Sequence, residues 1–483
     1  MFRKRIFLFV PGLFFFIIAT SLYLGHEHLT RLTKIYLPTQ HEVAEAEPST
    51  SIPSSASLIT SDPDFASSES TLAKILLTTP STTSIRVDQT KGSSFTSIPT
   101  WTPSQAIIIS NGTILDARRI APFVTAILDP AVTHPPRLQC PPLNTSRYDA
   151  LGTEPDAQRN DKPQHIDYFF ALNLRNCIDL LPRLLGSIVE AIRFLGPHRC
   201  ALSIVEGNSP DGTADVLIAL RPFLEDLGIH YIYNNSAIDP SKNDRIGKLV
   251  KLRNLVLGPL FKKEVNVSEE TTVVFINDVA ACTEDILELV LQRRNLNADM
   301  TCAMDWTFPG GADDPTFYGV WIARDGQGDT FFRIGENGNW ERAWELFPDN
   351  PQTKARFEAH LPFQVFACWN GATVFTAAPL LEGLRFRMVN GTADECWQGE
   401  PELFCKDMTF RGYDRIAVIP SVNLEYDNER ARRLKMNKGY VTNLVQDIQE
   451  NDNRIVWQDP PENVLCMPEF HRQSWRQWNE TLH

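Results

Sequence analysis

The chain has 483 residues, a net charge of −13 and nine cysteines. A general nucleic-acid binder gains its affinity from a basic surface that meets phosphates, so this acidic balance argues against that class and confines any phosphate site to a local patch. The length would accommodate two domains, but parts of the chain have compositions that do not form a packed core.

The N-terminus has the layout of a signal anchor. Ile6 to Leu24 form an uncharged, mostly apolar run of 19 residues, about the length that crosses a bilayer. Basic residues at 3–5 precede this run, so the positive-inside rule leaves 1–5 in the cytosol and places the remainder in the lumen, as a single-pass type II membrane protein. A cleaved signal peptide is the alternative, because small residues at 19–21 offer a cleavage site. Both interpretations predict the secretory pathway.

Residues 25–105 are predicted to form a stalk, and 106–165 a lead-in segment with a helix over 115–128. The stalk is rich in Ser, Thr and Pro, which bury too little apolar surface to fold and are typical of extended, O-glycosylated segments. All nine cysteines lie at or beyond Cys140, which suits disulfides in an oxidised domain, and their odd number leaves at least one without a partner in the chain. Six N-x-S/T triplets are compatible with luminal glycosylation, at Asn111, Asn144, Asn234, Asn266, Asn390 and Asn479.

Apolar runs and helical periodicity alternate after the lead-in segment. The predicted strands are 166–174, 201–205 and 229–233, and the predicted helices between them are 180–195 and 216–227. Such alternation predicts an α/β domain, here 166–445, with a mostly parallel, doubly wound sheet; residues 446–483 are a C-terminal extension. The chain has no GxGxxG or GxxxxGK[ST] loop, which excludes the usual dinucleotide-binding and ATPase sites.

The loop after the second strand concentrates polar side chains. It contains Glu206, Asn208, Ser209 and Asp211. Ligands of open α/β sheets bind outside the carboxyl ends of the strands, so these groups are candidates for hydrogen bonds to a ribose or a base. The same residues also satisfy a simple Pro-Asp-Gly turn, and that alternative stays open.

A basic patch over 242–254 stands out in this acidic chain. Arg245, Lys248 and Arg253 lie on a predicted helix, and the guanidinium of Arg253 suits bidentate recognition of a phosphate. A solvated helix face is the alternative explanation.

The run 273–279 reads as a buried strand that ends at an amide and a carboxylate, and a helix over 283–291 follows it. Asn277 and Asp278 therefore lie at the carboxyl end of a strand, where a nucleotide or a metal would be met. A carboxylate there is suited to hold Mg²⁺ or Mn²⁺ against a diphosphate. The alternative is that Asp278 only caps the turn.

Three further stretches are candidates for function. The predicted strand 299–306 ends in Asp305 and Trp306, a pair found both in sugar-binding sites and at buried sheet edges. An irregular segment over 310–339 is either a lid or a functional loop. The acidic run 394–407 is dense enough to suggest general acid–base or electrostatic work.

In combination, these motifs resemble the fungal α-1,3-mannosyltransferases related to the capsule-associated proteins of encapsulated yeasts, glycosyltransferase family 69. The similarity covers about 166–444. The stretches that carry it are 206–213, 252–254, 277–279, 400–407 and 419–426.

The resemblance implies a GT-A-like nucleotide-sugar fold, GDP-mannose as donor, a mannose-containing glycan as acceptor, retention at the anomeric carbon, and a Golgi or ER membrane location. It also implies Mn²⁺ or Mg²⁺, with Asp278 in the place of a DxD carboxylate, while Asn277 stands where many relatives of the fold have an acid. Glu400 and Asp407 are the implied catalytic residues, Glu400 facing the anomeric centre. A structural ion pair of Glu400 with Arg411 or Lys406 is the alternative.

Two other function classes stay open. A glycoside hydrolase would use paired carboxylates, but it has no diphosphate to hold, which leaves the basic patch and Asp278 unexplained. A luminal, non-catalytic lectin-like or scaffold protein descended from a transferase is the second.

Overall fold

The computed structural model describes residues 109–152, 165–449 and 451–482. The chain divides into two units, and every described residue belongs to the second, Ser70–His483. The predicted cytosolic tail, anchor and stalk lie outside the described residues. Within the described ranges, no helix is both long enough and apolar enough to cross a membrane.

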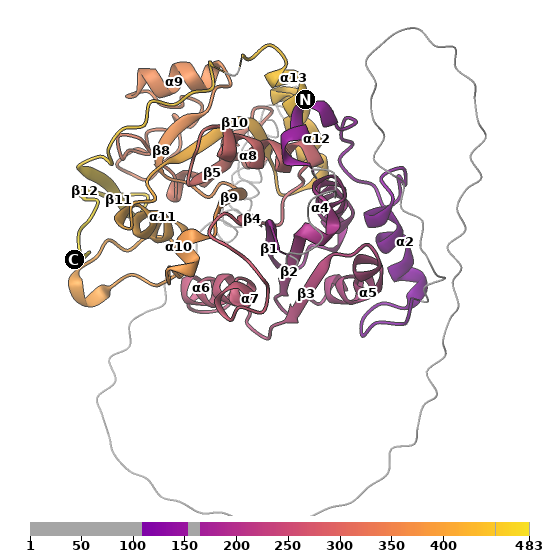
Figure 1. Cartoon of the computed structure of the whole chain (residues 1–483). Coiled ribbons are helices and arrows are strands. Elements are labelled where there is room, and N and C mark those ends of the chain that lie inside the picture. Colours follow the sequence, from indigo (N-terminus) through magenta and orange to yellow (C-terminus); the bar gives the residue numbers. More distant parts are fainter. Residues whose placement is uncertain (1–108, 153–164, 450, 483) are drawn as a thin grey trace, which may run out of the picture. The chain divides into compact units, whose positions relative to one another are not determined.

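A ten-stranded sheet runs through the second unit, with the order β3-β2-β1-β4-β9-β5-β10-β8-β7 and with β6 paired to β5 (Figure 1). Its strands are β1 (Tyr168–Leu174), β2 (Cys200–Glu206), β3 (His230–Asn235), β4 (Thr272–Ile276), β5 (Met300–Thr307), β6 (Thr316–Phe317), β7 (Arg324–Asp325), β8 (Phe363–Ala367), β9 (Ala372–Thr376) and β10 (Ile416–Leu424). A separate hairpin consists of β11 (Asn463–Glu469) and β12 (Arg472–Gln477).

The sheet is mixed, which corrects the prediction of a mostly parallel one. Strands β3, β2, β1 and β4 pair in parallel, as do β5 and β10. Strand β9 runs antiparallel to both β4 and β5, and β8 runs antiparallel to β10. The prediction failed here because the alternation of strand and helix that indicates parallel pairing stops after β5, so the pattern no longer fixes the direction of a strand.

Helices cover both faces of the sheet. They are α2 (Ala117–Leu128), α3 (Thr145–Tyr148), α4 (Leu181–Leu195), α5 (Thr213–Asp226), α6 (Arg245–Val256), α7 (Gly258–Phe261), α8 (Thr283–Asn295), α9 (Pro351–Glu358), α10 (Ala378–Leu381), α11 (Glu400–Phe410), α12 (Asn428–Lys438) and α13 (Val441–Val445). The 3₁₀ turns are η1 (Asp149–Leu151), η3 (Ile178–Leu180), η4 (Pro197–Arg199), η5 (Pro309–Gly311), η6 (Gly319–Trp321) and η7 (Gly391–Ala393).

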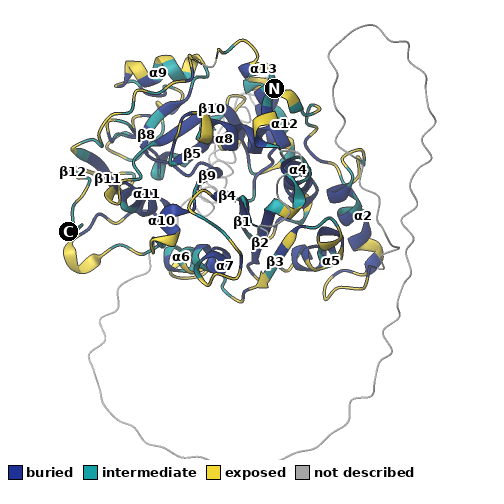
Figure 2. Cartoon of the chain, viewed as in Figure 1, coloured by how far each residue is buried: buried dark blue, intermediate teal, exposed yellow. Residues whose placement is uncertain are grey.

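Two hydrophobic cores lie on opposite faces of the sheet. Alternate residues of a strand point to opposite faces, and in β1 the side chains of Tyr168, Phe170 and Leu172 enter one core while those of Phe169 and Ala171 enter the other. Helices α2, α4, α5 and α8 contribute to the first core, and α6, α7, α10 and α11 to the second. Burial on both faces explains why the central strands read as continuous apolar runs (Figure 2).

Three disulfides tie distant segments together: Cys140–Cys282, Cys302–Cys368 and Cys396–Cys466. Cys177, Cys200 and Cys405 are free and buried. The first disulfide joins the lead-in segment to the start of α8, and the third joins the loop before α11 to the β11–β12 hairpin. The hairpin is thereby fixed beside the segment that leads into Glu400.

Candidate active site

The polar ends of several strands meet at one edge of the sheet. Because β9 runs antiparallel to β4, its first residue, Ala372, pairs with Ile276 at the end of β4, and Nδ2 of Asn370, just before β9, donates to the carbonyl of Ala303 in β5 at 3.0 Å. The backbone N–H of Asn277 donates to the carbonyl of Gly371 at 2.9 Å, and that of Ala280 donates to the carbonyl of Glu425 at 2.8 Å. These contacts bring together the residues that follow β4, precede β9 and follow β10. We name this region the sheet-edge site; it contains Asn277, Asp278, Asp305, Asn370 and Tyr426.

Asp278 is the most exposed carboxylate of the sheet-edge site, and it is half-buried. Its carboxylate has no hydrogen bond or ion pair to another side chain in the part of the chain that the structure describes. Burial raises the pKa of Asp278 to about 6, and the positive charge of Arg245 offsets only part of this shift. A half-buried carboxylate without a partner would gain free energy from a bound cation.

Asp305 is the second carboxylate here, and it is fully buried. The hydroxyl of Tyr426 donates to its Oδ2 at 2.7 Å, whereas its Oδ1 has no hydrogen-bond partner among the described residues. Burial raises the pKa of Asp305 to about 6. A Cβ at Gly319 would lie 2.9 Å from this Oδ1 and 2.6 Å from Oδ1 of Asn370, so only glycine fits against the two oxygens.

A chain of contacts joins the sheet edge to helix α11. The indole N–H of Trp369 donates to Oδ1 of Asn277 at 3.3 Å, and the guanidinium of Arg253 lies over the Trp369 ring, 4.6 Å from its centre. Nε of Arg253 donates to Oε1 of Glu400 at 2.8 Å, with both side chains largely buried. Glu400, the first residue of α11, is therefore paired with Arg253, not with Arg411 or Lys406 as the structural alternative proposed.

The other residues of the predicted basic patch differ from Arg253 in exposure. Arg245 begins α6 and is exposed, and Lys248 is half-buried and donates from Nζ to the carbonyl of Lys242 at 2.9 Å. Asp244 caps the helix by accepting from the N–H of Gly247. The positive charge of Arg245 acts on Asp278, while Arg253 is held against Glu400.

The loop after β2 is held by hydrogen bonds within itself and to the loop after β1. The carboxylate of Glu206 accepts from the backbone N–H groups of Asn208 and Ser209, at 3.2 and 2.7 Å. Oγ of Ser209 accepts from the N–H of Asn176, and Asp211 accepts from those of Ile178 and Thr213. Three of the four predicted ligand-binding groups thus accept structural hydrogen bonds from backbone N–H groups, and Asn208 is left exposed in the left-handed region at φ 59°.

Trp306 is buried at the sheet edge. It is 2% exposed, and its indole N–H donates to Oδ1 of Asn423 at 2.7 Å. Nζ of Lys438 lies 4.0 Å from the centre of its ring. Its surroundings are those of a packed edge, and its predicted contact with a nucleotide sugar stays a prediction.

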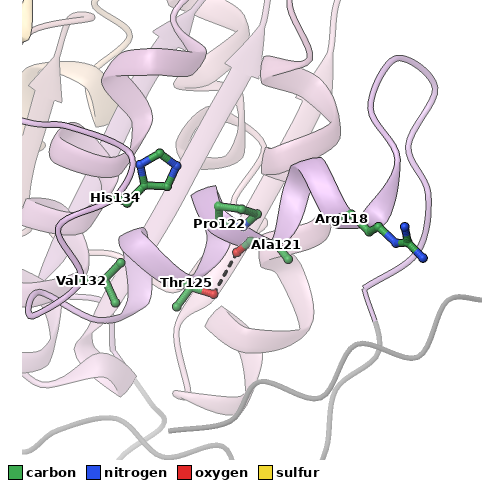
Figure 3. Close-up of a pocket in the computed structure, with 6 residues that line it drawn as sticks. All are labelled: Arg118, Ala121, Pro122, Thr125, Val132 and His134. Carbon is green, nitrogen blue, oxygen red and sulfur yellow. Dashed lines mark hydrogen bonds between the residues drawn. The ribbon is translucent and has the colours of Figure 1, made fainter. Parts of the chain in front are cut away.

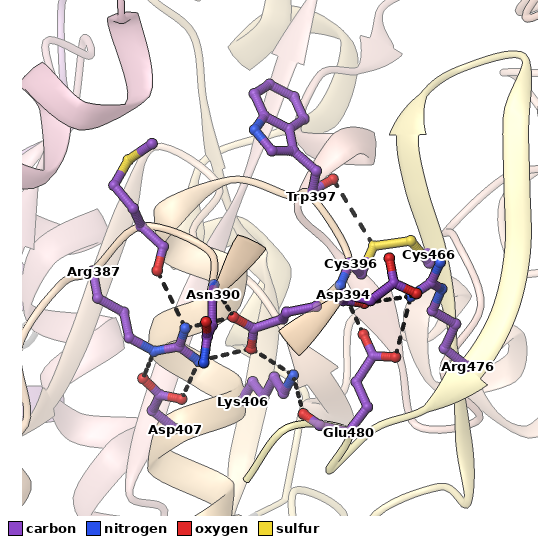
Figure 4. Close-up of polar contacts among 12 residues, drawn as sticks. Arg387, Asn390, Asp394, Cys396, Trp397, Lys406, Asp407, Cys466, Arg476 and Glu480 are labelled. Carbon is purple, nitrogen blue, oxygen red and sulfur yellow. Dashed lines mark hydrogen bonds and ion pairs between the residues drawn. A yellow bond between two sulfur atoms is a disulfide. The ribbon is translucent and has the colours of Figure 1, made fainter. Parts of the chain in front are cut away.

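Asp407 belongs to a network of ion pairs on the far part of α11 (Figure 4). Its two oxygens accept from Nε and Nη2 of Arg387 at 2.6 and 2.8 Å. Arg387 also pairs with Glu395, which pairs in turn with Nζ of Lys406 at 2.7 Å, and Lys406 donates to the carbonyl of Glu480. We name these five residues the C-terminal brace. Its complete pairing favours a structural role for Asp407, and the catalytic role of this residue stays a prediction.

A hollow of about 510 Å³ over α2 lies apart from these groups (Figure 3). It is lined by Arg118, Ala121, Pro122, Thr125, Val132 and His134. It contains no residue of the sheet-edge site, so it does not bear on the chemistry there.

Comparison with known proteins assigns the family. A family model described as Cryptococcal mannosyltransferase 1 matches residues 167–407. The alpha-1,3-mannosyltransferase CMT1 of Cryptococcus neoformans var. neoformans serotype D (strain JEC21) is 32% identical over 363 residues, which cover 69% of this chain and 77% of the relative. The chain belongs to the capsule-associated mannosyltransferase family. It is a glycosyltransferase of the mannosyltransferase type, as the resemblance implied.

Solved structures similar to this transferase are distant in sequence. The mannosyltransferase PcManGT of Pyrobaculum calidifontis, solved with GDP-Man and Mn²⁺, is 12% identical, covers 63% of this chain and 71% of its own, and gives a TM-score of 0.32. TarS 1–349 of S. aureus is 12% identical; the match covers 60% of this chain and 68% of that chain, with a TM-score of 0.31. These overlaps are partial.

The carboxylates of the sheet-edge site would hold a metal ion only together with oxygen atoms from a bound substrate or water. Among the described residues, no three His, Cys, Asp or Glu side chains gather in a way that would hold an ion. Among the described residues, Oδ1 of Asp305 nonetheless has no hydrogen-bond partner, and the carboxylate of Asp278 has no side-chain partner. Mg²⁺-type ions are commonly held by one or two carboxylates plus substrate phosphates and water, and this donor set matches that arrangement.

Sequence reasoning missed several residues of the transferase's site. Trp369 and Asn370 lie in a short link before β9, and Tyr426 follows β10. The apolar run 416–424 ends in polar residues as 273–278 does, so the rule that found Asp278 could have found Tyr426. No comparable local signal marks Gly319, whose importance comes from its close approach to Asp305.

Proposed function

We propose that this transferase has a GT-A-type fold and moves mannose from GDP-mannose to a mannose-containing glycan, forming an α-1,3 linkage with retention at the anomeric carbon. The main observation behind this proposal is that Asp278, at the end of β4, is a half-buried carboxylate without a side-chain partner among the described residues. The name of the relative CMT1 supports the sugar and the linkage. An anchored location in the Golgi or ER membrane is part of the proposal.

The donor's diphosphate would lie between Asp278 and the start of α6. Arg245 and Lys248 supply positive charge on that side, and Asn277 and Asn208 supply polar contacts for the nucleotide. A bound Mn²⁺ or Mg²⁺ would neutralise the departing diphosphate as a Lewis acid, with Asp278 as its protein ligand and Asp305 as a second oxygen group. Charge fixed in advance at the leaving group stabilises the transition state because no reorganisation is needed during the reaction.

Glu400 is proposed to face the anomeric carbon. A retaining transfer passes through a species with oxocarbenium character, which a nearby carboxylate stabilises. The hydrogen bond from Arg253 fixes one oxygen of Glu400, and the Trp369 ring beneath the guanidinium fixes Arg253. The arrangement orients the carboxylate before substrate arrives.

A nucleotide-sugar screen tests this function. Full-length protein is incubated with mannobiose, Mn²⁺ and, in separate reactions, GDP-mannose, GDP-fucose, UDP-glucose and UDP-N-acetylglucosamine. We expect a trimannoside only from GDP-mannose, with an α-1,3 linkage by NMR, and loss of product with EDTA that Mn²⁺ restores. No product from any donor would favour the lectin-like alternative, and free sugar released from mannobiose would favour a hydrolase.

A further inference from the structure

Two exposed aromatic side chains, Tyr318 and Trp397, and the half-buried Trp321 between them form a path that leads away from the sheet-edge site. Tyr318 is 50% exposed, and its ring packs edge-on against Tyr426 at 5.4 Å between centres, with the Tyr426 hydroxyl bonded to Asp305. The backbone N–H of Tyr318 also donates to the carbonyl of Asp305 at 3.0 Å. The path therefore begins in direct contact with the site.

Trp321 continues this path on the same side of the chain. It is the last residue of η6, and Tyr318 immediately precedes that turn. In a 3₁₀ turn, side chains three residues apart lie one above the other, so Tyr318 and Trp321 face the same way. Trp321 is fixed because its indole N–H donates to the carbonyl of Met467 at 2.9 Å.

Trp397 forms the far end. Its ring lies 5.8 Å from that of Trp321, it is 45% exposed, and in Figure 4 its indole points away from the ion pairs of the brace. It lines a hollow of about 330 Å³, within the usual size range of small-molecule sites, together with Asp394, Glu469 and Arg472. A Cβ at Gly399 would lie 3.1 Å from the Trp321 ring, so the path also touches the segment that enters Glu400.

We propose that Tyr318, Trp321 and Trp397, the aromatic ridge, bind the acceptor glycan, an inference that rests on the proposed function. A hexose has a face of C–H groups that stacks on the electron-rich face of an aromatic ring, and hydroxyls at its rim that bond to carboxylates and guanidinium groups. The aromatic ridge offers rings for stacking along its length and, at its Trp397 end, charged groups for hydrogen bonds to hydroxyls. The sugar that receives mannose lies at Tyr318, beside Asp305, and the more distant sugars of the chain lie at Trp397, where Asp394 and Arg472 meet their hydroxyls.

Calorimetric titration of full-length protein with mannobiose and with mannotetraose tests the ridge without requiring turnover. Wild-type protein is expected to bind mannotetraose more tightly than mannobiose. Trp397→Ala should weaken mannotetraose binding about tenfold and leave mannobiose within about twofold, because one stacking contact is lost at the far end. Trp397→Phe should restore most of the affinity, and Tyr318→Ala should weaken both ligands.

Trp344→Ala is the matched control, since Trp344 is 78% exposed and lies outside the ridge. Equal affinity for both glycans in wild type, no effect of Trp397→Ala, or the same loss in Trp344→Ala would overturn the inference. Melting temperatures check that each variant is folded. If wild type binds mannotetraose on the ridge but transfers nothing from GDP-mannose, the proposed function fails and the binding inference stands.

Discussion

Two groups of carboxylates in this transferase differ in how their charge is compensated. In the C-terminal brace, Glu395 and Asp407 are held by Arg387 and Lys406 at hydrogen-bond distances. At the sheet edge, Asp278 and Asp305 have no ion pair with any described Lys, Arg or His. One group is arranged as a closed structural network, and the other is open to a cation that comes from outside the chain.

The pKa values of the two groups show the same contrast. Burial alone would raise the pKa of Glu395, but hydrogen bonds from Arg387 and Lys406 lower it to about 2. Burial raises the pKa of both Asp278 and Asp305 to about 6, because the hydrogen bond from Tyr426 to Asp305 and the charge of Arg245 near Asp278 offset only part of it. Uncompensated groups in a concave polar site are candidates for function, whereas density of acidic residues in a sequence is a poor guide to it.

The largest effect is expected for Asp278→Asn. The amide keeps the shape but loses the charge that would hold a hard cation against the diphosphate, so kcat for transfer from GDP-mannose should fall roughly 10³-fold. Turnover assays at saturating donor and a circular dichroism spectrum measure activity and fold together. Activity within a few-fold of wild type, with an unchanged response to Mn²⁺, would remove Asp278 from the site.

A smaller loss is expected for Glu400→Gln. If the carboxylate acts mainly in the transition state, kcat should fall about 10²-fold while GDP-mannose binding is nearly kept. Steady-state kinetics paired with a GDP titration separates the two quantities. A purely structural ion pair with Arg253 would instead show a lowered melting temperature and a proportionate loss of binding and turnover.

Asp407→Asn should act on stability. It leaves part of the half-buried charge of Arg387 unpaired, which costs roughly 1–3 kcal/mol of unfolding free energy. Urea denaturation measures that loss, and kcat per folded molecule should stay near the wild-type value. A 10²-fold drop in kcat without destabilisation would restore the catalytic role that the sequence suggested.

The smallest effect concerns pH. A carboxyl group whose folded pKa lies above its unfolded value of about 3.9 destabilises the fold when ionised, so its contribution worsens as pH rises from about 4 through 6. Asp278→Asn removes this term and should stabilise the protein at pH 7.5 by roughly 1–2 kcal/mol, with the difference vanishing near pH 4. Denaturation at both pH values measures it, and an Asn variant less stable at pH 7.5 would contradict the unpaired state of Asp278.

The sequence carried enough information for the first half of the sheet and for its key carboxylate. Strands β1 to β5 are short apolar runs bounded by polar residues, and the structure confirms all five within a few residues. Asp278 could be predicted because it ends such a run. The direction of β9 could not be predicted, because the neighbours and the orientation of this strand depend on pairing with residues that are distant in the chain.

Pairing also explains what sequence reasoning could not decide at the site. The partner of Glu400 is Arg253, 147 residues away, and the nearer Lys406 pairs elsewhere. Glu206 satisfies the turn interpretation that stayed open, since its contacts to Asn208 and Ser209 are local. Ser209 and Asp211 also bind the loop after β1, 33 residues away, which the turn sequence alone does not indicate.

Calorimetric titration of Mn²⁺ into full-length protein in the presence of GDP tests the open character of the sheet-edge site most directly. Wild type and Asp407→Asn are expected to bind one Mn²⁺ per chain with similar affinity, and Asp278→Asn is expected to bind it at least about tenfold more weakly, since it loses a charged ligand. Equal Mn²⁺ affinity in wild type and Asp278→Asn, or a loss confined to Asp407→Asn, would contradict the assignment of Asp278 as the metal-holding carboxylate.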